Sequence, residues 1–177
     1  GRGSADMKGG IAAIIYAVQC LLEAGVKLKG DLIIESTIEE EDGGIGGTLA
    51  TILRGYIADA AIITEPTMLN IGIASAGVMY FRIKVPGKAA HASCAHLGVS
   101  AIAKAMKIYD AMMALNAERQ KRIHYPPAEV EPEMKGHATT INIGKISGGD
   151  WPSTVPALVE LEGRVGWPPG EELEDVK

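Results

Sequence analysis

The stretch GVMYFRIKVPG, residues 77–87, decides how the second half of the chain folds. Its apolar and polar side chains alternate one by one, and a period of two is that of a strand with one buried face. The side chains expected on the buried face are Met79, Phe81, Ile83 and Val85. Those expected to face solvent are Val78, Tyr80, Arg82 and Lys84. The stretch therefore predicts a half-buried strand of a one-sided sheet.

The residues after this strand predict one helix and two more strands. A helix is expected over residues 100–115, with apolar side chains at helical spacing on one face that would fill the core. These side chains are Ile102, Ala105, Met106, Tyr109, Met112 and Met113. The charged, proline-bearing residues 118–137 are expected to form a loop. Two further strands are expected at 138–146 and 157–165, and a helix begins within 168–177. This order is a split βαβ plan without its last strand.

The first half of the chain has a different pattern. Residues 11–22 carry apolar side chains at helical spacing, and Gly25 follows as the stop. The apolar run 32–34 predicts a buried strand. A second helix is expected over 48–56, and a second short strand over 59–67. Helix, strand, helix and strand in this order predict an α/β unit with a parallel sheet.

The pattern changes near Ala74, which predicts two domains, one over residues 1–75 and one over 76–177. The second domain is expected to continue past the end of the chain, because its plan lacks a strand. The chain opens on GRGSADMKGG without an initiator Met, so we interpret it as a piece of a longer protein. Its missing targeting signal then says little about location.

Composition narrows the class of protein. With 47% apolar and 22% charged residues, the 177-residue chain is expected to be globular. A net charge of −5 argues against a general nucleic-acid binder. No apolar run approaches the roughly 20 residues that cross a bilayer, so no membrane association is expected. Cys20 and Cys94 are isolated thiols, which suits a reducing compartment and predicts a cytoplasmic protein.

Acidic residues collect at three predicted connections of the first domain. They are Asp6, the run Glu39 to Asp42, and Glu65. Adjacent like charges repel one another, so the run is either a solvated turn or a place where a cation sits. The carboxyl ends of parallel strands are where ligands collect, and a divalent metal would turn the repulsion into binding energy. The glycines of GGIGGT lack the Lys of a phosphate-binding loop, and Ser4 lies in no nucleophile elbow.

Four motifs together carry a resemblance to a known family. GRGSADMKGG, EEEDGGIGGT, ITEPT and GKAAHAS resemble, in order and spacing, the co-catalytic zinc deacylases and exopeptidases. That family includes acetylornithine deacetylase, succinyl-diaminopimelate desuccinylase, aminoacylase and glutamate carboxypeptidase. The resemblance implies a zinc-peptidase-like catalytic α/β domain with a partial, parallel-rich sheet. It also implies an α+β ferredoxin-like lid that pairs two subunits.

The resemblance also implies roles for the acids of the first domain. Asp6 is similar to the carboxylate that bridges two zinc ions, for which cobalt can substitute. Glu41 and Glu65 are similar to the further carboxylate ligands, and Glu40 is similar to the general base that handles the proton of the attacking water. Glu39 and Asp42 match no role, and we expect both to be solvated.

Three residues of the second domain receive roles in the same way. The resemblance implies that His91 reaches the partner's active site and donates to the oxyanion of the tetrahedral intermediate. Arg164 either lies in an ion-paired strand face beside Glu160 and Glu162 or, as the resemblance implies, binds a substrate carboxylate. Ser153 stands where many members of the family place an Asn that contacts substrate. This variant is similar to acetylornithine-deacetylase-like members.

These features lead to a functional hypothesis and to an alternative. The leading hypothesis is a dinuclear zinc amidohydrolase that removes an acyl group from an N-acyl amino acid or cleaves a small peptide. The alternative is a non-catalytic protein of the same fold that acts only by association. Residues 77–87 and the helix 100–115 are expected to pair two subunits into a homodimer. The family's histidine ligands are not in this chain, so we expect the chain alone to bind zinc weakly and to be inactive.

Overall fold

The structure is a computed structural model, and it describes residues 1–41, 46–130 and 132–177. The chain divides into two compact units, Gly1–Ile73 and Ala74–Lys177. The expectation that Asp42 is solvated falls outside the described residues.

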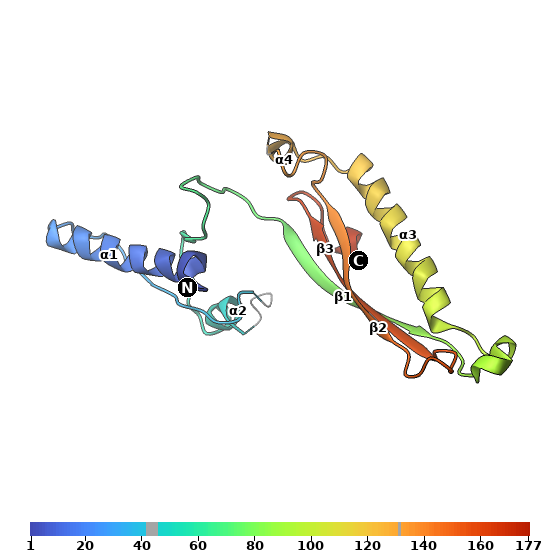
Figure 1. The fold of residues 1–177 in the computed structure, drawn as a ribbon. Helices are drawn as coiled ribbons and strands as arrows, with labels where there is room; N and C mark the ends of the chain where they lie inside the picture. The colour runs from blue at the N-terminus through green and yellow to red at the C-terminus, as the bar shows by residue number, and fades with distance from the viewer. Residues whose placement is uncertain (42–45, 131) are drawn as a thin grey trace. The chain divides into compact units, whose positions relative to one another are not determined.

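The second unit contains a three-stranded antiparallel sheet. Its strands are β1 (Gly77–Pro86), β2 (Thr140–Gly148) and β3 (Leu158–Trp167). Their order is β1-β3-β2, and β3 runs antiparallel to both neighbours (Figure 1). Therefore β1 and β2 run parallel to each other with β3 between them, as a split βαβ unit requires. The three predicted strands and their plan are confirmed.

Burial along β1 follows the predicted alternation. Every second residue from Gly77 to Val85 is at least half-buried, and the residues between them are exposed. On the exposed face, ion pairs cross the strands. They join Arg82 to Glu162 at 3.3 Å, Lys145 to Glu162 at 2.7 Å, and Lys84 to Glu160 at 3.4 Å.

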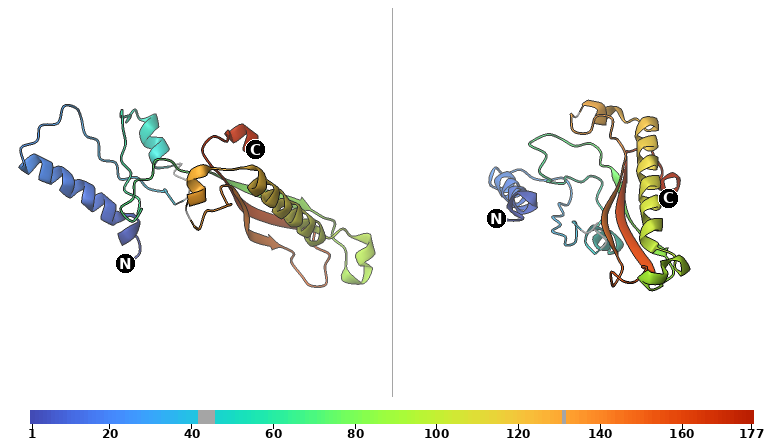
Figure 2. Two further views of the ribbon diagram at one scale, coloured as in Figure 1. Left: turned by 90° about the horizontal axis from the view of Figure 1, so that it is seen from above. Right: turned by 45° about the vertical axis from the view of Figure 1, so that its right-hand side comes forward.

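Helix α3 (Ala101–Arg122) lies along the other face of the sheet and packs on all three strands (Figure 2). It runs about two turns past the predicted end, so the expectation of a loop from residue 118 was wrong there. The extra turns are held by residues far away in the sequence, because Asn116 accepts a hydrogen bond from the Ile141 backbone at 2.7 Å. Arg119 likewise donates to Thr139. The remaining short helices are η2 (Ala92–Leu97), α4 (Pro126–Val130) and α5 (Leu173–Val176).

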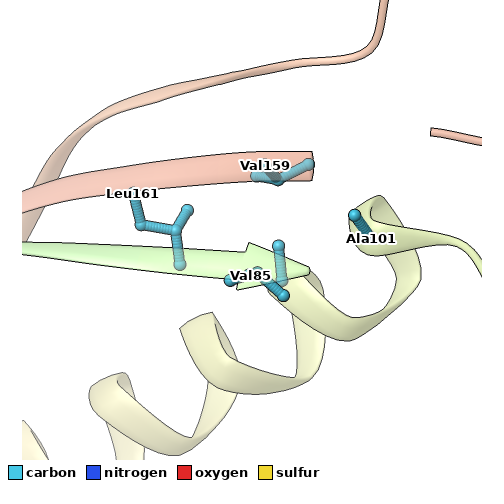
Figure 3. Packing of buried hydrophobic residues seen from close by; sticks show 5 residues of the cluster. Val85, Ala101, Val159 and Leu161 are labelled. Carbon is cyan, nitrogen blue, oxygen red and sulfur yellow. The ribbon is translucent and has the colours of Figure 1, made fainter. Parts of the chain in front are cut away.

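The hydrophobic core lies between α3 and the sheet. Its buried members are Val85, Ala101, Ala105, Val159 and Leu161 (Figure 3). Two small alanines bring the helix close to the strands.

The expected core face of α3 was therefore only partly right. Ala105 is buried, and Ile108 packs against the core, but Ile102, Met106 and Tyr109 are 46, 50 and 39% exposed. The buried stripe thus runs through positions 101, 105 and 108, one residue from the line 102, 106, 109. A rotation of one residue is about 100° around a helix, so the larger side chains leave the buried stripe. Met106 and Tyr109 still border the sheet, because they line a pocket with Ile143, Ile146 and Leu161.

The first unit contains helices. They are η1 (Ser4–Lys8), α1 (Gly9–Glu23) and α2 (Thr48–Leu53). Helix α1 ends as predicted, because Gly25 has a φ of 75° and its N–H bonds the Leu22 carbonyl. Both predicted helices of this unit are confirmed.

The expected parallel sheet of the first unit is absent from its described residues, where no strand is formed. Both apolar runs that predicted strands are exposed, with Ile33 at 45%, Ile62 at 88% and Ile63 at 75%. A buried strand needs neighbouring strands for its backbone groups and cover for both of its faces. Neither run has such a neighbour in the described part of the unit, which is the physical reason for the difference.

A second correction concerns length and hydropathy in this unit. Residues Ser4–Glu23 form a helical stretch of 20 residues with a mean hydropathy of 1.3, long and apolar enough to cross a membrane by length and composition alone. The expectation that no segment reaches this length was wrong. Core helices of soluble proteins pass the same test, and an apolar stripe on one helix face is typical of them. The absence of a membrane partner stays a prediction.

Candidate functional site

The acids of the three connections lie close together within the first unit. Glu65 is half-buried, and burial raises the pKa of its carboxyl. The negative charges of Asp6 and Glu40 raise this pKa further, as do a side-chain hydrogen bond with Asp6 and the charge of Glu41. The structure therefore brings together the four acids to which the sequence assigned metal and base roles.

Two glycines explain how these connections can meet. A Cβ atom added at Gly10 would lie 2.5 Å from both the carbonyl oxygen and the Oγ1 of Thr64. Only glycine lets the start of α1, four residues after Asp6, pack this closely on the residue before Glu65. In the same way, a Cβ atom at Gly47 would overlap the carbonyl oxygen of Ile38, so the chain after the acidic run returns against the chain before it.

The donor set does not by itself fit a zinc centre. The available donors are carboxylate oxygens and the hydroxyl of Thr64, whose Oγ1 is buried and has no hydrogen-bond partner among the described residues. Such oxygen ligands suit magnesium or calcium, whereas zinc sites are rich in imidazole and thiolate. Residues 1–73 contain no histidine. In the described parts of the chain, no three His, Cys, Asp or Glu side chains are arranged to hold a metal ion.

The acids are thus near enough to perturb one another but are not arranged as metal ligands. Glu39, Glu40 and Glu41 are exposed, so a solvated acidic turn also remains open for this run. The expected roles of Asp6, Glu41 and Glu65 as ligands and of Glu40 as base stay predictions.

His91 lies at the start of η2 in the second unit, where it acts as the N-cap. Its Nδ1 accepts a hydrogen bond from the Ser93 backbone N–H at 3.2 Å, and the Ser93 hydroxyl lies 2.8 Å from the same nitrogen. A backbone N–H can only donate, so Nδ1 is the acceptor and the proton of the neutral ring is on Nε2. His91 is exposed, and its ring therefore offers an N–H donor to another molecule.

The structure places Ser153 beside His91. The Ser153 carbonyl accepts from the Ala92 N–H at 2.8 Å, and His91 forms a backbone bridge with Thr154. The candidate substrate-binding serine and the candidate oxyanion donor thus belong to one pair of adjoining segments.

Arg164 lies elsewhere on the sheet. It is exposed at the middle of β3, in register with Tyr80 of β1 and Asn142 of β2. Among the described residues it has no carboxylate within ion-pair distance, because Glu160 and Glu162 pair with other cations. The six steps from Leu158 to Arg164 span roughly 20 Å at the rise of a strand. His91 is bridged to Thr154, which lies before the Leu158 end of β3. One small substrate therefore cannot touch both His91 and Arg164 of one chain.

Two residues near these sites carried no prediction. Thr64 supplies the buried hydroxyl next to Glu65, and Ser93 contacts the ring of His91. No local signal marks Ser93, because any residue except proline could donate this backbone N–H and histidine is not a usual N-cap. No local signal marks Thr64 either, because its burial depends on Gly10, 54 positions earlier in the chain.

The comparison with protein families decides the assignment. Residues 73–177, more than half of the chain, match the peptidase dimerisation domain of the M20 family. The chain belongs to the M20 peptidase family. The resemblance drawn from the four motifs is confirmed at this level, and the unit Ala74–Lys177 of the M20 chain is a dimerisation domain.

Curated relatives agree with this membership. The M20 chain is 33% identical to the N-formyl-4-amino-5-aminomethyl-2-methylpyrimidine deformylase of Halalkalibacterium halodurans, over 99% of the chain and 42% of that protein. It is 34% identical to the acetylornithine deacetylase of Vibrio cholerae serotype O1, over 98% of the chain and 44% of that protein. The chain thus spans less than half of the length of these relatives.

A solved structure shows the same fold. The crystal structure of aminopeptidase PepT from Bacillus cereus ATCC 10987 matches with a TM-score of 0.53 and 23% identity. The match covers 96% of the M20 chain and 41% of the aminopeptidase chain.

Proposed function

We propose that the M20 chain is part of a metal-dependent amidohydrolase that removes an acyl group from an N-acyl amino acid or cleaves a small peptide. The observation that carries the proposal is the convergence of Asp6, Glu40 and Glu41 on Glu65. Four carboxylates from three connections are costly to gather unless a cation balances them. The relatives include a deformylase, an acetylornithine deacetylase and a probable carboxypeptidase. These names support hydrolysis of an amide bond as the class of reaction.

Each residue has a defined part in this proposal. Glu40 takes the proton of the attacking water as general base. Zinc, with cobalt as a substitute, is the metal that the family resemblance implies. Asp6, Glu41 and Glu65 would be the ligands from this chain, and imidazole ligands would have to come from outside it.

His91 and Arg164 act on the substrate from two subunits. The Nε2–H of His91 donates to the oxyanion that develops on the scissile carbonyl. The planar guanidinium of Arg164 binds a substrate carboxylate, with Ser153 as a further polar contact. Because His91 and Arg164 of one chain are too far apart for one small substrate, each active site takes its His91 from the partner subunit.

We propose a homodimer formed through β1 and α3 of the dimerisation domain. Ile102, Met106 and Tyr109 make an exposed apolar stripe on α3, at helical spacing. Such a stripe on one face suits burial against a second copy. Light scattering of the natural protein at micromolar concentration is expected to show a dimer, and Met106→Glu a monomer. A monomeric wild-type protein would remove the route by which His91 reaches a neighbouring site.

The test of the reaction uses the full natural protein that carries this sequence. It is assayed with zinc or cobalt on N-acetyl-ornithine, N-succinyl-diaminopimelate and simple dipeptides. Glu40→Gln is expected to lower kcat by about 10²–10⁴, the usual contribution of a general base. Glu39→Gln is the matched control, because it removes a neighbouring exposed carboxylate without a role, and it is expected to keep activity. Full activity in Glu40→Gln would mean that the base is assigned wrongly.

A second candidate function is a non-catalytic M20 protein that acts by association. It is favoured by the match of residues 73–177 to a peptidase dimerisation domain, which is a unit of association. The same assay separates the two, because a natural protein that dimerises but hydrolyses none of the substrates with zinc or cobalt supports the second candidate. A cytoplasmic location remains part of the proposal, and Cys20 and Cys94 are both free thiols in the structure.

A further inference from the structure

We propose that Ser93 is a positioning residue for His91, which holds the imidazole in the tautomer and orientation that present Nε2–H outward. The use of that donor in catalysis rests on the proposed function. The hydrogen bonds that create it do not, since they lie within residues 91–94 of the second unit.

The residue at the start of η2 is an unusual N-cap. N-cap positions usually hold Asn, Asp, Ser or Thr, whose side-chain oxygen accepts from a backbone N–H. Here His91 has that position, with φ −64° and ψ 143°, and its Nδ1 replaces the oxygen. The cap can form only while Nδ1 carries a free lone pair. Of the two neutral tautomers, the start of η2 therefore selects the one protonated on Nε2.

The hydrogen bonds between Ser93 and His91 have a defined direction. The Ser93 N–H points at Nδ1 from 3.2 Å, so the Ser93 hydroxyl at 2.8 Å must also donate to this nitrogen. If Nδ1 carried a proton, this proton would face the proton of the Ser93 backbone N–H, and the two would repel each other. With the hydroxyl proton committed to the ring, the Cys94 thiol at 3.8 Å is the donor to Ser93 Oγ. A short chain of donors thus runs from Cys94 through Ser93 to His91.

Backbone hydrogen bonds hold the segment around His91 and Ser93 in place. The Cys94 N–H bonds the His91 carbonyl at 2.8 Å, and the adjoining Ala92 N–H bonds the Ser153 carbonyl at 2.8 Å. On the other side, the Val155 N–H bonds the Ala90 carbonyl at 2.8 Å. With the backbone held at these points, the side-chain bonds to Ser93 decide how the ring lies. An outward donor held in place is what oxyanion stabilisation requires.

The first test reads the ring directly in the 177-residue chain, with ¹⁵N-labelled histidine at neutral pH. Wild type is expected to show a His91 Nδ1 resonance of the unprotonated, hydrogen-bonded type and a protonated Nε2. Ser93→Ala is expected to move the Nδ1 resonance, and Ser93→Thr to restore it. Ser100→Ala is the matched control, because that serine caps α3 through the Ala103 N–H at 3.2 Å and is expected to leave His91 unchanged. An unchanged Nδ1 resonance in Ser93→Ala overturns the proposal.

The second test measures catalysis in the full natural protein. Ser93→Ala is expected to lower kcat about tenfold, as loss of an orienting partner does, with KM within about twofold. Ser93→Thr is expected to recover most of the loss. If Ser93→Ala keeps its kcat while His91→Ala loses activity, the positioning role is wrong and the proposed function stands. If both variants keep activity, His91 is not the oxyanion donor, and both proposals fail at this residue.

Discussion

The two units of the M20 chain differ in how their apolar residues are used. In residues 74–177, β1, β3 and α3 close over a core in which Leu161, Ala101 and Ala105 are 0% exposed. In the described part of residues 1–73, no hydrophobic side chain is buried to this degree, and Ile62 is 88% exposed. Both units contain short runs of apolar residues that predict strands. The difference is that, among the described residues, only the second unit provides neighbouring strands for its apolar runs.

This contrast shows that an apolar run predicts a strand only where the chain also supplies the neighbours. The alternating run of β1 has β3 beside it and α3 on its buried face. The apolar run at residues 32–34 has no such cover in the described part of its unit. Stability is therefore expected to be concentrated in the dimerisation domain.

The largest expected effect is at the core of the dimerisation domain. Leu161→Ala is expected to lower the free energy of unfolding by about 3 kcal/mol, because it opens a cavity at a fully buried position. Denaturant titration followed by tryptophan fluorescence reports on this unit, since Trp151 and Trp167 both lie in it. Ile62→Ala, at an exposed position of the first unit, is expected to change the free energy of unfolding by less than about 0.5 kcal/mol. Equal losses in the two variants would contradict the contrast between the units.

The next effect is at the buried ion pair that ends α3. Arg119 is 5% exposed, donates to Thr139 Oγ1 at 3.0 Å and pairs with Glu171 at 2.9 Å. Arg119→Ala is expected to lower the free energy of unfolding by about 2 kcal/mol, because it leaves Glu171 and Thr139 without this partner. Arg122→Ala, an exposed arginine of the same helix, is the control and is expected to lose less than about 0.5 kcal/mol. Similar losses would mean that helix propensity, not the ion pair, sets the end of α3.

A smaller, pH-dependent effect belongs to the exposed face of the sheet. Hydrogen bonds from Lys145 and Arg82 lower the pKa of Glu162 from its ordinary value of 4.5. A lowered pKa in the folded state stabilises the fold above the ordinary value, and this contribution is lost as the pH falls through the folded pKa. The melting temperature is therefore expected to fall less between pH 5 and pH 3 in Glu162→Gln than in wild type, in scans at low salt. High salt should reduce the difference, and a difference that grew with salt would exclude the ion pairs as its cause.

The smallest expected effect is that of zinc on the chain alone. The carboxylates of the first unit supply oxygen donors without imidazole, so zinc is expected to bind weakly. Calorimetry after chelation and dialysis should show no tight stoichiometric binding, and added zinc should leave the unfolding midpoint unchanged. Tight binding would mean that a ligand is misplaced, and His91 and His96 would be the first residues to substitute.

Particular residues show how far the sequence could predict this structure. The alternation at residues 77–85 predicted the buried and exposed faces of β1, because successive side chains of a strand point to opposite faces of the sheet. The order of the acids at successive connections predicted that Asp6, Glu40, Glu41 and Glu65 would lie near one another. The start of η2 at His91 was not predicted, because histidine is not a usual N-cap residue.

Other features depended on contacts between distant residues. The end of α3 is set by Arg119 and Asn116, whose partners Thr139 and Ile141 lie 20 and 25 positions away. The stripe of α3 that is buried depends on how closely Ala101 and Ala105 approach the sheet. No local pattern contains this information.

The sequence by itself determined the elements that local periodicity specifies, the family carried by four motifs and the set of candidate acids. Only the tertiary structure decided which apolar runs became strands and where α3 ended. The physical reason is that burial and hydrogen bonding need a partner. A side-chain pattern states what a segment can bury or accept, whereas the partner is chosen by the folded chain.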